Sequence, residues 1–155
     1  NWWEKKVNGT QSLAEFRAKF QVDELLVAQT PAWSWSVRPA QATLGSGVLS
    51  LNRHAARFSE VTAPEMAELA ELLARLEKAL RSAFGYDLIN YLMLMMIDPD
   101  VHFHVLPRYA EPRSFAGMEF VDAGWPGVPN LGAPNYTDSM INQLILQQLQ
   151  SSWPE

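Results

Sequence analysis

The chain contains no cysteine, so disulfide bonds, cysteine-rich zinc sites and cysteine nucleophiles are all excluded. Positive charge is also scarce: 12 Lys and Arg stand against 17 Asp and Glu, which gives a formal net charge of −5. This balance argues against a broad nucleic-acid-binding or polybasic membrane surface, although a local basic pocket is compatible with it. The most apolar window, residues 88–97, contains Asn90 and is shorter than the roughly 20 residues that a membrane-spanning helix needs. With no signal peptide visible either, we expect a cytoplasmic protein that binds neither nucleic acid nor membrane.

What the chain does have is enough apolar material for a core. Hydrophobic residues make up 48% of its 155 residues and charged residues only 19%, which is unlike a disordered chain. The length suits one domain. We expect a single domain over 1–155, with its core at about 25–110, an irregular Gly- and Pro-rich wrap over 111–136 and a C-terminal helix over 137–152.

Three segments have the pattern of helices. Ser12 and Glu15 have capping-box spacing, which predicts a helix from Ser12 to Phe20. The longest helix is predicted to begin at Thr62 and to end at Gly85. Its predicted apolar face consists of Met66, Leu69, Leu73, Leu76 and Leu80. Residues 137–150 form a third amphipathic pattern.

Strand patterns fill the space between these helices. Trp33 to Val37 alternates with a period of two, and residues 48–51 predict a second short strand after a Gly-containing turn. Residues 88–96 predict a buried strand, which a short turn would join to residues 101–106 in an antiparallel hairpin. The predicted fold class is therefore α+β: an antiparallel sheet of about five strands, a long helix packed on one face, and terminal helices.

Chemistry-bearing residues concentrate in the last of these strands. Alternation places Asp100, His102 and His104 on one strand face and the intervening apolar residues in the core. Burying several titratable side chains in a row costs folding free energy unless that face is exposed to water or the side chains have hydrogen-bond partners. An ordinary solvent-facing sheet surface and a reactive site are both compatible with this pattern alone. We expect the remaining histidine, His54, to be a surface residue.

The segment 101–109, VHFHVLPRY, resembles the signature of the histidine triad (HIT) family of nucleotide hydrolases and transferases. That signature is His-φ-His-φ-His-φ-φ, with φ apolar, often followed by Pro-Arg. Here Asp100 stands in place of the first histidine, so the triad is incomplete. The resemblance covers roughly residues 33–109 and includes, in the family's order, Gly45, a short strand, Arg53-His54, a long helix and an apolar strand carrying Asn90. It implies a HIT-like fold and a homodimer whose two sheets join edge to edge, to which Trp2, Trp3 and the final helix could contribute.

The resemblance also implies a reaction. A neutral imidazole nitrogen can attack phosphorus and divide one hard displacement into two. His102 would attack the α-phosphorus of a nucleotide and carry the nucleotidyl group, while His104 would donate a hydrogen bond to a non-bridging oxygen. Asp100 would orient a histidine or act as an acid, and its carboxylate is expected to raise the histidine pKa values.

Several weaker candidates accompany these three residues. Asn90, Arg108 and Arg53 are candidates for substrate binding, and Arg38 is a further basic residue that could contact substrate. The family's usual Gly-Gln-Ser/Thr stretch is replaced by residues 95–99, so the phosphate contacts made there in the family are in question. We expect no cofactor and no protein-bound metal, although Mg²⁺ could arrive with a polyphosphate substrate.

Two other functions remain open on the sequence. Asp100, His102 and His104 supply a carboxylate and two imidazoles, which could ligate a metal in a metal-dependent enzyme. Alternatively, the chain could be a non-catalytic nucleotide-binding module that kept the fold after losing the complete triad.

Overall fold

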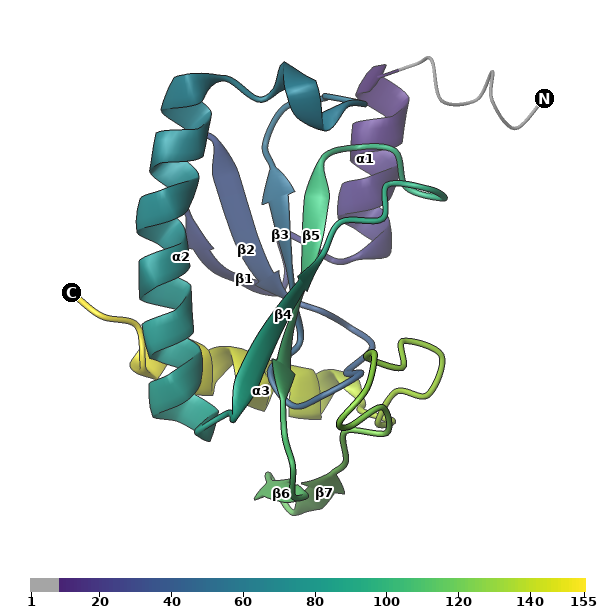
Figure 1. Ribbon diagram of the computed structural model, residues 1–155, viewed down its shortest axis with the longest axis vertical. Coiled ribbons are helices and arrows are strands. Elements are labelled where there is room, and N and C mark those ends of the chain that lie inside the picture. Colours follow the sequence, from purple (N-terminus) through teal and green to yellow (C-terminus); the bar gives the residue numbers. More distant parts are fainter. Residues whose placement is uncertain (1–8) are drawn as a thin grey trace.

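A computed structural model describes residues 9–155 and shows a five-stranded antiparallel sheet with helices on both faces (Figure 1). The strand order is β1-β2-β3-β5-β4. These strands are β1 (Leu26–Gln29), β2 (Trp33–Val37), β3 (Gly47–Leu51), β4 (Leu88–Leu92) and β5 (His102–Arg108). The helices are α1 (Gly9–Lys19), α2 (Ala63–Phe84) and α3 (Ser139–Ser151), with a 3₁₀ turn η2 (Phe58–Glu60). The predicted α+β class is confirmed, while Trp2 and Trp3 lie outside the described residues.

The two faces of the sheet follow the alternation of the sequence. In β2 and β3, Trp35 and Leu49 oppose each other and join the main core, which also contains the buried side of α2. Their neighbours Ser36 and Val48 face the other way, and Val48 clusters with Phe16 and Phe20, from α1 and the turn that follows it. A strand exposes successive residues on opposite faces, so α1 and α2 lie on opposite sides of the sheet.

Helix α2 is bounded as the sequence predicts. The Thr62 side chain accepts from the Glu65 backbone N–H and the Glu65 side chain reaches back, which completes a capping box. Gly85 ends the helix with a φ of 61°, a left-handed conformation that glycine adopts without steric cost. One predicted core position is wrong: Met66 is 39% exposed, because the apolar face runs through Leu72 instead.

The structure corrects four local predictions. Helix α1 begins at Gly9, so Ser12 lies inside the helix and does not cap it. Strand β4 ends at Leu92 and is the edge of the sheet, with Leu88 60% exposed, so the predicted buried strand over 88–96 is wrong. Strands β4 and β5 do pair in antiparallel fashion, but the long loop 93–101 joins them in place of a short turn. The segment predicted to be irregular contains a small hairpin of β6 (Arg113–Phe115) and β7 (Met118–Phe120).

Within residues 9–155 no helix is long and apolar enough to cross a membrane. This finding agrees with the short apolar windows of the sequence.

Candidate active site

His102 and His104 lie on the sheet face that α1 covers, and both are buried rather than exposed to solvent. Only 2% of His102 and 6% of His104 is exposed. The Phe16 ring lies 4.8 Å from the His102 ring, and the Phe20 ring lies 5.7 Å from the His104 ring, measured between centroids. Of the alternatives that the strand pattern leaves open, the solvent-facing surface is therefore excluded, because α1 packs across the face that carries the two histidines.

The hydrogen bond of His102 fixes which of its nitrogens carries the proton. Nδ1 lies 2.6 Å from the backbone carbonyl oxygen of Asp100. A carbonyl oxygen can only accept, so Nδ1 must donate its proton. In the neutral ring the lone pair is then on Nε2, which is the form that a nucleophile requires.

Burial keeps both imidazoles neutral near pH 7. Desolvation is the main cause that lowers the pKa of His102; the hydrogen bond to the Asp100 carbonyl and then the carboxylates of Asp98 and Asp100 only partly oppose it. Desolvation also lowers the pKa of His104 to about 4, helped by His102 and by the positive charge of Arg38. Asp100 acts on the pKa of His102 in the predicted upward direction, but desolvation outweighs it, so the pKa is lowered. No such effect of Asp100 accompanies the lowered pKa of His104.

Asp100 itself is buried at 1% exposure, and its carboxylate is held by two residues from distant parts of the chain. Oδ1 lies 2.6 Å from Nδ1 of His54, and Oδ2 accepts a 2.7 Å hydrogen bond from the Ser12 hydroxyl. His54, which was expected to be a surface residue, keeps 33% of its side chain exposed, but its ring also binds the buried carboxylate of Asp100. We call Ser12, His54 and Asp100 the carboxylate cluster. The only sequence signal for it is the Arg53-His54 element of the family resemblance.

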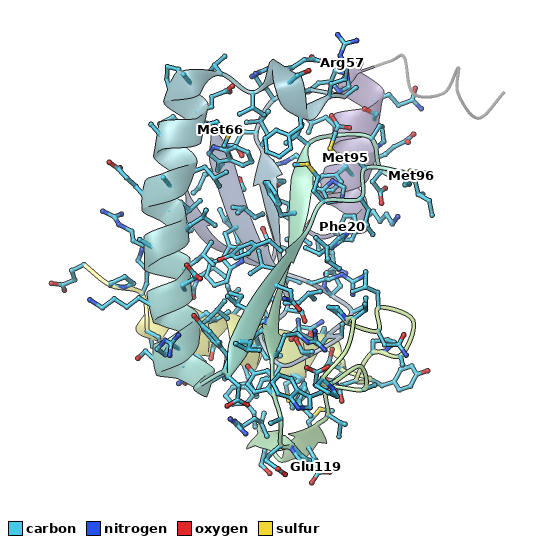
Figure 2. The ribbon with its side chains drawn as sticks, in the orientation of Figure 1. Phe20, Arg57, Met66, Met95, Met96 and Glu119 are labelled. Atoms are coloured by element: carbon cyan, nitrogen blue, oxygen red, sulfur yellow. The ribbon has the colours of Figure 1, made fainter. Side chains whose placement is uncertain are left out.

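A cavity of about 260 Å³ opens beside the two histidines. Its walls come from α1 and its C-terminal turn, the end of β2, the loop 93–101 and β5. Its lining residues are Lys19, Phe20, Arg38, Leu94, Met95, Met96, Ile97, Asp98, His102 and His104. Figure 2 shows Phe20, Met95 and Met96 close together where α1 faces this loop. We call this space the histidine cavity.

Two predicted substrate residues, Asn90 on β4 and Arg108 at the end of β5, lie away from the histidine cavity. Asn90 opposes Leu106 in the β4–β5 ladder, and its Oδ1 accepts a 2.7 Å hydrogen bond from Nη1 of Arg108. Arg108 is 4% exposed and its Nε is 2.7 Å from a carboxylate oxygen of Asp122. Asn90 and Arg108 line a separate cavity of about 380 Å³ with residues 125–129. Their contact with substrate stays a prediction.

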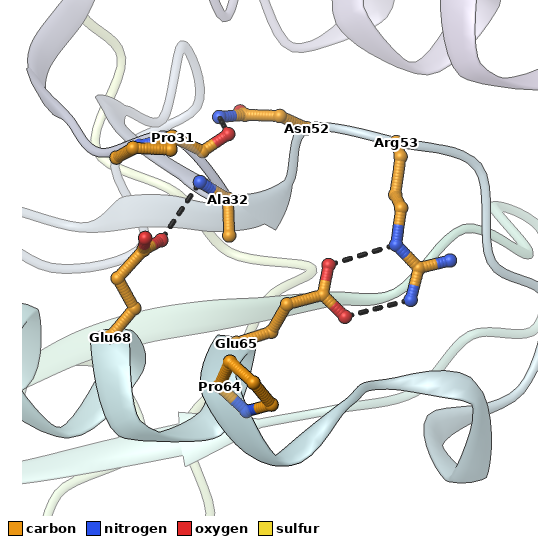
Figure 3. A pocket seen from close by; sticks show the side chains of 7 residues that line it. All are labelled: Pro31, Ala32, Asn52, Arg53, Pro64, Glu65 and Glu68. Carbon is orange, nitrogen blue, oxygen red and sulfur yellow. Dashed lines mark hydrogen bonds and ion pairs between the residues drawn. The ribbon is translucent and has the colours of Figure 1, made fainter.

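Arg53 lies in a third place, at the N-terminal end of α2. Its guanidinium makes two hydrogen bonds to the Glu65 carboxylate, at 2.8 and 2.7 Å (Figure 3). This pocket, of about 420 Å³, shares no lining residue with the histidine cavity. The structure thus brings His102 and His104 together over Asp100, but does not bring Arg53 to them.

The arrangement also bears on the metal alternative. Among residues 9–155 no group of three His, Asp or Glu side chains is placed to hold a metal ion. The carboxylate oxygens of Asp100 already bind His54 and Ser12, which leaves two imidazoles without a third ligand.

Comparison with known proteins defines the fold. No family model matches the sequence, and no curated protein matches it. Among solved structures, a histidine triad protein from Bradyrhizobium japonicum superposes with a TM-score of 0.66 at 20% identity, covering 86% of this chain and 94% of that one. A hypothetical histidine triad nucleotide-binding protein from Sulfolobus tokodaii gives 0.65 at 13% identity, with coverages of 92% and 90%. A zinc-bound histidine triad family protein from Mycobacterium smegmatis superposes with a TM-score of 0.56 at 15% identity, covering 90% of this chain and 96% of that one.

The chain therefore has the histidine triad fold over most of its length. The resemblance that begins with the segment 101–109 is confirmed at the level of the fold, which includes the five-stranded antiparallel sheet and the long helix.

Proposed function

We propose that the chain is a histidine triad nucleotide hydrolase or nucleotidyl transferase that acts at an α-phosphorus through a covalent nucleotidyl-histidine on His102. The observation that carries this proposal is the 2.6 Å hydrogen bond between Nδ1 of His102 and the Asp100 carbonyl oxygen. It fixes the tautomer and leaves Nε2 as the nucleophilic nitrogen, beside a cavity that could receive a phosphoryl group.

The chemistry would proceed in two displacements. Nε2 of His102 forms a bond to phosphorus while the bond from phosphorus to the leaving group breaks. Water or a second acceptor then attacks the same phosphorus and gives up its proton to solvent. The bond from phosphorus to Nε2 breaks, its electron pair returns to Nε2, and the nucleotide is released. His104 has a pKa lowered to about 4 and is therefore neutral at pH 7, so it contributes to the site as a hydrogen-bonding group and not as a fixed cation.

The replacement of a histidine by Asp100 is compatible with this mechanism. The backbone of Asp100, not its side chain, orients His102, and any residue at this position has that carbonyl. The carboxylate points to His54 and Ser12, where it anchors α1 over the histidines. Asp100 is in this account a positioning residue.

The experiment that tests the proposal is detection of the intermediate by intact-protein mass spectrometry. The wild-type chain would be mixed briefly with adenosine and guanosine phosphoramidates and with dinucleoside polyphosphates. A mass increase of one nucleotidyl group that His102→Asn abolishes, with the fold retained, is the expected result. Turnover by a well-folded His102→Asn protein would contradict the covalent mechanism, and the absence of any adduct or turnover would favour a non-catalytic nucleotide-binding module.

A homodimer is part of the same proposal. Strand β4 is an edge of the sheet, and Leu88 on it is 60% exposed. An edge strand with apolar side chains is suited to pair with a second copy. Light scattering after gel filtration should give twice the chain mass, and Leu88→Lys should shift the equilibrium towards the monomer; a wild-type monomer would contradict the proposal.

A further inference from the structure

A phosphoryl group in the histidine cavity needs a positive charge, and most basic side chains around the site are already paired. Lys19 lines the cavity, but its Nζ is 2.8 Å from the Asp98 carboxylate. Arg108 lines another cavity and forms an ion pair with Asp122. With both histidines neutral, none of these groups supplies a free cation to an anion next to His102.

Arg38 is different from these residues. It directly follows β2, where its backbone N–H donates to the Ser46 carbonyl at 2.8 Å, and its side chain lines the histidine cavity. Its guanidinium makes one hydrogen bond, from Nη1 to the Ala40 carbonyl at 2.6 Å. Within the described part of the chain no carboxylate forms an ion pair with it, and its Nε is buried without a hydrogen-bond partner. A partly buried guanidinium without an anion is costly, and here burial lowers its pKa.

A second residue that lines the same cavity, His104, also has an unpartnered polar atom. Nδ1 of His104 is buried and has no hydrogen-bond partner among residues 9–155. Arg38 is near enough to His104 for its charge to lower the histidine's pKa. Two polar groups lining one cavity, each with unsatisfied capacity, are the arrangement that a bound anion would complete.

The rest of the cavity wall offers little to a phosphate. The loop 93–101 contributes four apolar side chains, Leu94, Met95, Met96 and Ile97, together with Asp98. The carboxylate of Asp98 would repel an anion, and its ion pair with Lys19 only offsets this negative charge. The positive charge in this cavity that no carboxylate neutralises is therefore that of Arg38.

We propose that Arg38 binds the phosphoryl group of the substrate and thereby selects phosphorylated nucleosides over nucleosides. The identity of the substrate as a nucleotide rests on the proposed function, whereas anion binding by Arg38 is testable by itself. The role of Arg38 is electrostatic: it offsets the negative charge of the phosphoryl oxygens while Nε2 of His102 approaches the phosphorus.

Equilibrium binding separates this role from a structural one. Isothermal titration would compare AMP with adenosine and GMP with guanosine, and ¹H–¹⁵N NMR of the histidine side chains would follow added inorganic phosphate. Arg38→Gln removes the charge, Arg38→Lys keeps it, and Arg75→Gln removes the same charge from the exposed side of α2 as a control. Thermal melting would establish that each variant is folded. If Arg38→Gln is not folded, nucleotide affinity would be compared between Arg38→Lys and wild type instead.

The expected result is a loss of nucleotide affinity of about 10- to 100-fold in Arg38→Gln, typical of a charge-assisted hydrogen bond. Nucleoside affinity should not change, Arg38→Lys should lie between wild type and Arg38→Gln, and Arg75→Gln should match wild type. Equal nucleotide affinity in wild type and Arg38→Gln overturns the inference, and so does a wild-type protein whose histidine signals do not respond to phosphate.

The outcome is distinguishable from that of the proposed function. Arg38-dependent phosphate binding without a nucleotidyl-His102 adduct would support this inference and contradict the mechanism. If Arg38→Gln formed the nucleotidyl-His102 adduct as fast as wild type, the mechanism would be supported and the role of Arg38 would be contradicted.

Discussion

The carboxylate of Asp100 lies 2.6 Å from Nδ1 of His54, although 46 residues separate the two in sequence. Ser12, 88 residues away, donates to the other oxygen of the same carboxylate at 2.7 Å. One buried side chain thus connects α1, the segment after β3 and the start of β5. Asp100, the residue that departs from the family signature, therefore holds α1 in place over the two histidines.

Removing the carboxylate should destabilise the protein. Asp100→Ala leaves His54 and Ser12 without their partner, and we expect the free energy of unfolding to fall by about 2–5 kcal/mol. Asp100→Asn keeps an acceptor and should cost roughly 1–2 kcal/mol. Urea unfolding measures both, with Glu24→Gln on the exposed surface as the control. Equal stability of Asp100→Ala and wild type would show that the cluster contributes nothing.

The contact between Gly9 and His54 should be sensitive to a single methyl group. A Cβ added at Gly9 would overlap with the His54 ring at Cδ2, and Asp100 restrains that ring. Gly9→Ala should therefore destabilise the protein although alanine is the better helix former, because the ring or α1 must move.

A double-mutant cycle isolates this effect. In a His54→Ala background the ring is absent, so Gly9→Ala should be neutral or stabilising there. If Gly9→Ala has the same effect on the free energy of unfolding in both backgrounds, the steric explanation is wrong.

Stability should fall as the pH drops from 7 towards 4. The folded-state pKa of His104 is about 4, below the ordinary value of 6.5, so between these values the unfolded chain binds more protons than the folded chain. This histidine then removes up to about 1.4 kcal/mol of stability per pH unit across that window, and His102, whose pKa is also lowered, adds in the same direction.

Comparison with a variant assigns this pH dependence. His104→Gln cannot titrate, so its free energy of unfolding should depend less on pH between 7 and 4 than that of wild type. Urea unfolding at four or five pH values provides the slopes. Parallel slopes for the two proteins would mean that His104 is not buried in its neutral form.

Removal of metal should leave the fold unchanged. Two imidazoles without a third ligand do not form a tight structural site, so EDTA should not shift the thermal midpoint of the purified protein. Metal analysis should find less than one equivalent of zinc. Two results would favour the metal-dependent alternative. One is stoichiometric zinc in wild type that the His102→Asn variant does not bind. The other is a thermal midpoint that added Zn²⁺ raises in wild type but not in that variant.

Local patterns determined much of the fold. The capping box at Thr62 and Glu65, the left-handed Gly85 and the alternation of Trp33 to Val37 each depend on near neighbours in the chain, so periodicity and capping chemistry predict them directly. The same local logic placed His102 and His104 on one face of a strand. Segment 101–109 was sufficient to indicate the histidine triad fold.

Tertiary structure decided what covers that face and which groups meet on it. No periodicity in β5 reveals that Phe16 and Phe20 would bury the histidines, or that desolvation would outweigh the Asp100 carboxylate in setting their pKa values. His54, Arg38 and Arg53 look alike in sequence as polar residues near strand ends. Packing alone brings His54 to Asp100 and pairs Arg53 with Glu65, because these contacts join different elements of the fold. It also places Arg38 at the histidine cavity with no carboxylate partner in the described part of the chain.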